Sequence, residues 1–88
     1  MLKESEVEEE LRGMRFSVPV AEWRVRAGED HRGVSALWVW AILEEKDLSS
    51  DVCHEIREAV WERLIAAHEP EIGWVYVRFR AVGEEVGT

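Results

Sequence analysis

The sequence predicts a small α+β protein, a two-layer sandwich with the element order α-β-β-α-β. Three patterns support this prediction. Apolar residues recur at helical spacing from about residue 50 to 68, side chains alternate with period two in 20–27 and 72–82, and residues 36–43 form an uninterrupted apolar run. The 88 residues leave room for a single domain. It is expected to hold a three-stranded mixed sheet with one long amphipathic helix on one face, and a short N-terminal helix.

Residues 1–13 are expected to form this N-terminal helix or an arm. Glu and Leu favour helix, and Gly13 suits the position that follows a helix end. The apolar stripe of the segment is narrow, because Val7 and Leu11 lie four positions apart among glutamates. The segment is therefore expected to dock only lightly on the rest of the protein.

A first strand is expected within residues 16–27, followed by a hairpin loop over residues 28–33. Pro19 restricts the first half of the segment to an edge or a lead-in position. In the second half, apolar and charged residues alternate, with Trp23 and Val25 on one face. The loop begins and ends with glycine and is polar between them, which is typical of a β-hairpin.

The segment 34–44 is the strongest strand prediction. No polar side chain follows Ser35 until Glu44, so both faces of this strand are apolar. Such a run is typical of a strand that is buried on both faces. Its aromatic and β-branched residues and its short length favour a strand over a buried helix. One face carries Leu37, Val39, Ala41 and Leu43, and the other carries Ala36, Trp38, Trp40 and Ile42.

The long helix is expected to start at a serine cap, Ser49 or Ser50, and to end before Pro70. A last strand follows over residues 72–82, and residues 83–88 are expected to form a loose tail. A strand–helix–strand connection within one sheet makes its two strands parallel. Because the doubly apolar strand belongs at the centre, the predicted strand order is 1-2-3.

The hairpin register decides which side chains share the face opposite the long helix. If residues 27 and 34 pair, Trp38 and Trp40 lie under the helix, whereas a one-residue slip moves them to the opposite face. Loops of two or four residues favour the first register. In that register the face expected to bind a partner comprises Arg24, Arg26, Leu37, Val39, Trp74, Tyr76, Arg78 and Arg80.

This face, apolar in the middle and flanked by arginine, predicts an association surface, because large exposed apolar patches are uncommon on monomers. The favoured hypothesis is a small non-enzymatic interaction module that forms a homodimer through this face or binds another protein. Alternatively, the N-terminal helix folds back over the face, although its few apolar residues would cover it poorly. A second hypothesis is a nucleic-acid-binding regulator that uses the arginine and aromatic side chains.

The charge and composition limit these hypotheses. A net charge of −8 disfavours broad binding to nucleic acid, although residues 1–10 alone hold five Glu against one Lys. The single cysteine, Cys53, permits no internal disulfide and favours a cytoplasmic location. Neither a signal peptide nor an apolar run of about 20 residues is visible, so no membrane partner is expected. The absence of Asn and Gln resembles the composition of thermophile proteins.

The hairpin loop is the one place where an enzyme site is considered, as a third hypothesis. There Asp30 could orient His31, and Arg32 could hold an anion. Polar residues between glycines are, however, ordinary hairpin residues. His54 and Glu58 could share a metal ion, but no spacing in the chain supplies three or four ligands. Catalytic residues, a metal site and a cofactor are therefore not predicted.

Overall fold

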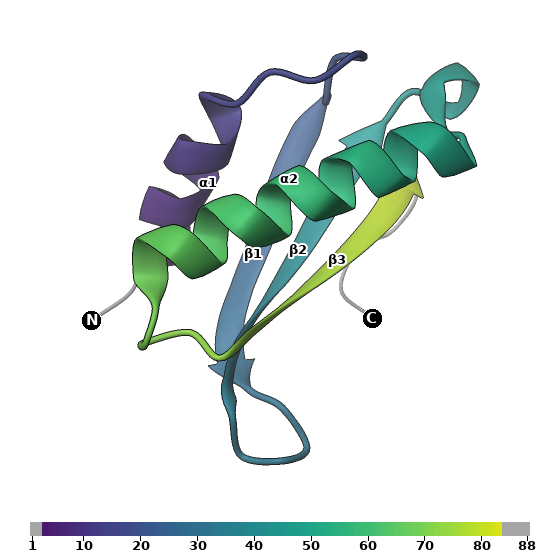
Figure 1. The fold of residues 1–88 in the computed structure, drawn as a ribbon. Helices are drawn as coiled ribbons and strands as arrows, with labels where there is room; N and C mark the ends of the chain where they lie inside the picture. The colour runs from purple at the N-terminus through teal and green to yellow at the C-terminus, as the bar shows by residue number, and fades with distance from the viewer. Residues whose placement is uncertain (1–2, 84–88) are drawn as a thin grey trace.

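The computed structural model describes residues 3–83 and has the element order α-β-β-α-β that the sequence predicts (Figure 1). The helices are α1, Glu4–Arg12, and α2, Ser50–His68, with a short 3-10 helix η1, Glu45–Asp47, before α2. The strands are β1, Glu22–Glu29, β2, Ser35–Leu43, and β3, Trp74–Ala81. The predicted tail beyond Gly83 lies outside the described residues.

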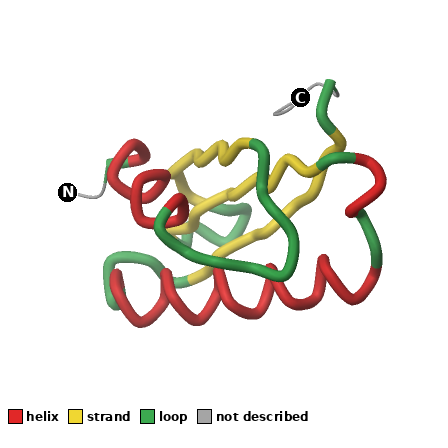
Figure 2. Tube along the Cα trace, turned by 90° about the horizontal axis from the view of Figure 1, so that it is seen from above, coloured by secondary structure: helices red, strands yellow, loops and turns green. Residues whose placement is uncertain are grey.

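The three strands form one mixed sheet in the predicted order β1-β2-β3. β1 is antiparallel to β2, and β2 is parallel to β3. In Figure 1 the helix α2 crosses the sheet diagonally, while α1 lies beside β1. Figure 2 shows the long connection after α1 sweeping past α2 before it enters β1. Both helices thus share one side of the sheet, which we call the helix face.

The core lies between the helix face and the two helices. Ile56, Val60 and Leu64 recur along α2 at helical spacing and are fully buried. Their partners on the sheet are Trp23, Val25, Leu37, Val39, Ala41, Leu43, Val75 and Val77. The helix α2 starts as predicted, because the Ser49 hydroxyl accepts a hydrogen bond from the Val52 N–H at 3.2 Å.

The helix α1 docks more tightly than its sequence predicts. Val7 and Leu11 are both 0% exposed and belong to the same buried cluster as the core residues of α2. Glu10 also links the two helices, since it accepts from Arg63 Nε at 2.9 Å and lies 3.0 Å from His68 Nε2. Partial burial raises the pKa of Glu10, but these two partners outweigh it and lower the pKa below its usual value. The alternative in which this helix covers the opposite face of the sheet is therefore wrong.

The hairpin register differs from the one favoured by the sequence. Ala27 pairs with Leu37 rather than with residue 34. The reason is a three-residue loop: Asp30 N–H donates to Val34 O, and Gly33 N–H donates to Asp30 O, both at 2.9 Å. Gly33 has φ of 76°, which is the left-handed conformation required when a turn is followed by a one-residue bulge. Because the loop has an odd number of residues, the β2 side chains that face the helices are the ones that a loop of two or four residues would place on the opposite face of the sheet.

Candidate binding face

The side of the sheet opposite the helices, here called the second face, is a grid of side chains from all three strands. Its rows follow from the strand register. In order they are Glu22–Ile42–Arg80, Arg24–Trp40–Arg78, Arg26–Trp38–Tyr76 and Gly28–Ala36–Trp74. Each of the two tryptophans of β2 therefore lies between a β1 arginine and a polar or charged residue of β3.

The middle column of this grid is largely out of water in a single chain. Trp40 is 8% exposed, Ile42 is 7% exposed and Ala36 is fully buried, while Trp38 is half-buried. Long arginine stems on both flanking strands can cover such rings and leave their charged ends in solvent. Burial of the apolar middle strand therefore does not by itself require a partner, which corrects the main argument made from the sequence.

Trp38 and Tyr76 form a rigid aromatic pair in the third row. Their ring centroids lie 5.4 Å apart, and the ring planes differ by 16°. The Tyr76 hydroxyl donates a hydrogen bond to Asp30 Oδ2 at 3.1 Å, which links the pair to the hairpin loop. Gly28 lies beside the Trp38 ring, and a Cβ there would make an ordinary van der Waals contact of 3.5 Å with Trp38 Cζ3. The two rings therefore stack on each other across neighbouring strands.

The arginines of the second face are not all neutralised. By register this face carries Arg24, Arg26, Arg78 and Arg80 against one carboxylate, that of Glu22. Arg24 pairs with Glu22, and Arg80 Nη1 donates to Phe79 O at 2.7 Å. Within residues 3–83, the side chains of Arg26 and Arg78 make no hydrogen bond or ion pair.

A hollow of about 630 Å³ lies over this part of the grid. Its lining consists of Arg26, Ala27, Gly28, Glu29, Trp38, Trp40, Arg78 and Arg80. The hollow therefore joins the two unpaired guanidinium groups to the two tryptophans of β2. Arginine heads beside aromatic rings suit a ligand that has both negative charge and planar groups.

The structure brings together six of the eight residues predicted to bind a partner. By register these are Arg24, Arg26, Trp74, Tyr76, Arg78 and Arg80, although the ring of Trp74 contacts Trp61 of α2. Leu37 and Val39 do not, since both are 0% exposed in the core beneath the helices. Trp38 and Trp40 take their places. The spacing of Asp30 and Gly33 was the signal for this register, because Asp favours the first position of a type I turn and Gly the left-handed position after it.

Asp30 holds the hairpin together. Its carboxylate accepts hydrogen bonds from the backbone N–H of Arg32 at 2.8 Å and of Val34 at 3.1 Å, and also pairs with the Arg32 guanidinium at 2.9 Å. The bonds from Arg32, followed by those from Val34 and Tyr76, hold the pKa of Asp30 well below its usual range. The ring of His31 makes no hydrogen bond within the described part of the chain. Asp30 therefore does not orient His31 in this structure.

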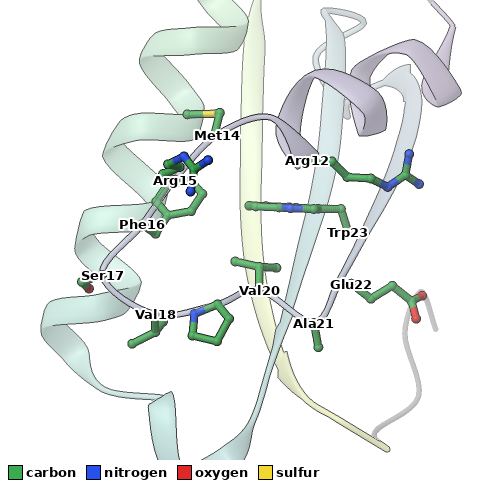
Figure 3. Close-up of a pocket in the computed structure, with 11 residues that line it drawn as sticks. Arg12, Met14, Arg15, Phe16, Ser17, Val18, Val20, Ala21, Glu22 and Trp23 are labelled. Atoms are coloured by element: carbon green, nitrogen blue, oxygen red, sulfur yellow. The ribbon is translucent and has the colours of Figure 1, made fainter.

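A second hollow, of about 580 Å³, lies beneath the connection from α1 to β1 (Figure 3). The ring of Trp23 points toward Phe16 across it, and the two centroids are 5.9 Å apart. The connection is fixed to α2 by Ser17, whose N–H and Oγ donate to the Glu55 carboxylate at 2.9 and 2.5 Å. These bonds lower the pKa of Glu55. The serine hydroxyl is thus held in a structural bond.

No group of three or more His, Cys, Asp and Glu side chains within residues 3–83 is arranged to hold a metal ion. No helix in that range is long and apolar enough to cross a membrane. Compared with known proteins, the chain matches no family, no curated protein and no solved structure.

Proposed function

We propose that the protein is a small non-enzymatic binding module whose second face takes an anionic partner with planar groups, and that single-stranded nucleic acid is the partner class that fits best. The observation that supports this proposal is the pair of guanidinium groups of Arg26 and Arg78, which lie beside Trp38 and Trp40 and have no partner among residues 3–83. Sheets that bind single strands combine aromatic stacking with nearby positive charge.

The net charge of −8 is compatible with this proposal because the charges are segregated. Five of the acidic residues lie on α1, and α2 carries Asp51, Glu55, Glu58 and Glu62. Both helices lie on the other side of the sheet. Long-range repulsion from these acids slows the approach of a polyanion. A polyanion that reaches the second face nevertheless contacts a surface on which positive charge is in excess.

Face-to-face association of two copies is less well supported than binding of an anion. Such a dimer would bring two sets of four arginines together, while the register of the described strands places one acidic residue of each copy, Glu22, among them. Like charges at a contact are unfavourable unless each is paired. The apolar gain is also small, because Trp40 and Ile42 are already buried within one chain.

Titration of a fluorescently labelled oligothymidylate by anisotropy, over a range of salt concentrations, tests the proposal. Arg26→Ala and Arg78→Ala should each weaken binding and reduce the slope of log K against log[salt] by about 0.7 per lost phosphate contact. Arg12→Ala is the matched control, since it removes the same charge from a residue that pairs with Glu8 and Glu9 on α1. A duplex of the same length should bind less well, because its bases are already stacked.

Two results would contradict the proposal. One is the absence of binding even at low salt. The other is an equal loss of affinity in all three arginine variants, because it would show that overall charge, rather than the second face, governs binding.

A further inference from the structure

The two edges of the sheet are treated differently by the rest of the chain. Along β1, the Glu8 carboxylate accepts a hydrogen bond from Val25 N–H at 3.2 Å, and the Glu4 carboxylate accepts one from Ala27 N–H at 2.7 Å. The helix α1 thus satisfies outward-pointing groups of this edge and covers it (Figure 1). An edge that is covered in this way cannot pair with another strand.

Along its first half, the β3 edge has no such cover from the residues that the structure describes. Val82 N–H donates to Leu43 O at 2.9 Å and so points toward β2. Because backbone groups alternate along a strand, the N–H and C=O of Val75, Val77 and Phe79 point away from β2. The Phe79 carbonyl is occupied by Arg80. Within the described residues, the outward groups of Val75 and Val77 make no hydrogen bond.

A hollow of about 500 Å³ runs beside this open half of β3, between the strand and α2. It is lined by Arg57, Glu58, Trp61, Trp74, Val75, Tyr76, Val77 and Arg78. The rings of Trp61 and Trp74 meet edge to face there, with centroids 5.7 Å apart, and Trp74 is 42% exposed. The Trp61 Nε1–H is buried and has no acceptor in the part of the chain that the structure describes. This edge thus combines free backbone groups with exposed aromatic surface.

We propose that β3 pairs antiparallel with β3 of a second copy, about a twofold axis at Tyr76. This register places Val75 of one copy opposite Val77 of the other, twice. Each such pair exchanges two hydrogen bonds, so the free outward groups of Val75 and Val77 are all satisfied and the occupied Phe79 carbonyl is not needed.

The side chains of the strand are complementary in the same register. Trp74 lies opposite Arg78 of the second copy in this register, and the two Tyr76 residues lie opposite each other. An unrelated strand would have to supply this pattern independently, whereas a second copy supplies it by symmetry. The pairing also continues the sheet, so the second faces of both copies lie on one side. Because few residues pair, we expect a weak, concentration-dependent dimer.

Sedimentation equilibrium from micromolar to millimolar concentration tests the proposal. The mass should rise from that of one chain to twice that value. Trp74→Arg sets two guanidinium groups opposite each other and should keep the protein monomeric, whereas the control Trp74→Tyr keeps an aromatic ring and should still dimerise. Trp74 is 42% exposed and is not a member of the buried core.

Amide hydrogen exchange identifies the edge that pairs. The Val75 and Val77 amides should become slower to exchange as concentration rises, while the Val25 and Ala27 amides, already bonded to α1, should not change. A single-chain mass at millimolar concentration would overturn the proposal. A dimer that survives Trp74→Arg, or one that leaves the Val75 and Val77 amides unprotected, would overturn it equally.

Discussion

The ring of Trp38 stacks on the ring of Tyr76 from the neighbouring strand, with centroids 5.4 Å apart. Stacking of a base on such a ring is worth about 1–3 kcal/mol. Trp38→Ala should therefore weaken oligonucleotide binding by fivefold or more, on the order of 1 kcal/mol. Anisotropy titration measures the affinity, and circular dichroism checks that the variant is folded. Unchanged affinity in a folded variant would exclude this pair from the binding surface.

The strand register predicts that substitutions of two adjacent residues of β2 reduce stability by different amounts. Leu37 is 0% exposed beneath α2, so Leu37→Ala should reduce the free energy of unfolding by about 2–5 kcal/mol. Trp38→Ala should cost less, because its ring is only half-buried. Urea denaturation of the two variants makes the comparison. If Trp38→Ala were the less stable of the two variants, the strand register of β1 and β2 described above would be wrong.

Asp30 gives the hairpin a dependence on acid pH. Its pKa is lowered in the folded protein, so its contribution is present above the ordinary Asp pKa of about 3.9 and is lost as the pH falls toward the folded value. Asp30→Asn should therefore lower the melting temperature at neutral pH. Arg32 stays charged in this range, and Tyr76 is the other group that faces Asp30.

Melting curves of the wild type and Asp30→Asn should then converge as the pH falls below about 4. Glu10 and Glu55, whose pKa values are also lowered, are present in both proteins and cancel in the comparison. A gap in melting temperature that stays constant down to strongly acid pH would show that Asp30 does not support the hairpin through its charge.

Glu4 and Glu8 are expected to protect the β1 edge. Replacing both by Ala removes the acceptors for Ala27 and Val25, and each hydrogen bond is worth about 1 kcal/mol. The two amides should exchange faster in the double variant. Glu6→Ala and Glu9→Ala together form the matched control, because they remove the same charge from α1 without an acceptor for β1. Equal exchange rates in both double variants would mean that these bonds do not form in solution.

Gly73 is required by a close approach between two segments. A Cβ at this position would lie 2.6 Å from Val34 Cγ1, well inside van der Waals contact. Gly73→Ala should therefore destabilise the protein by about 1–3 kcal/mol, as overpacking does. The double variant Gly73→Ala with Val34→Ala should recover part of this loss in thermal unfolding. Absence of any recovery would place the cause of the loss elsewhere.

Periodicity in the sequence predicted the elements that are governed by burial. The stripe of Ile56, Val60 and Leu64 was sufficient to predict α2, and the run that is apolar on both faces placed β2 at the centre of the sheet. These patterns are strong because each misplaced residue would expose apolar surface. The strands β2 and β3 are parallel, as predicted, because a strand–helix–strand connection within one sheet makes its two strands parallel.

The hairpin register and the position of α1 could not be predicted in the same way. Both faces of β2 are apolar, so hydrophobicity alone could not decide which side Leu37 and Trp38 occupy, and the length of the hairpin loop decided it instead. The position of α1 depends on Glu4 and Glu8 as acceptors for a strand edge, a role that leaves no periodic signal in the chain.

The glutamates of α1 have a consequence for growth beyond a pair. A sheet with two uncovered edge strands can add further strands without end, as amyloid fibres do. Here α1 covers the β1 edge, so pairing through β3 would use the remaining uncovered edge of each copy and end the assembly at a dimer. The helix α1 would then prevent polymerisation, and deleting it should convert a closed dimer into an open-ended aggregate.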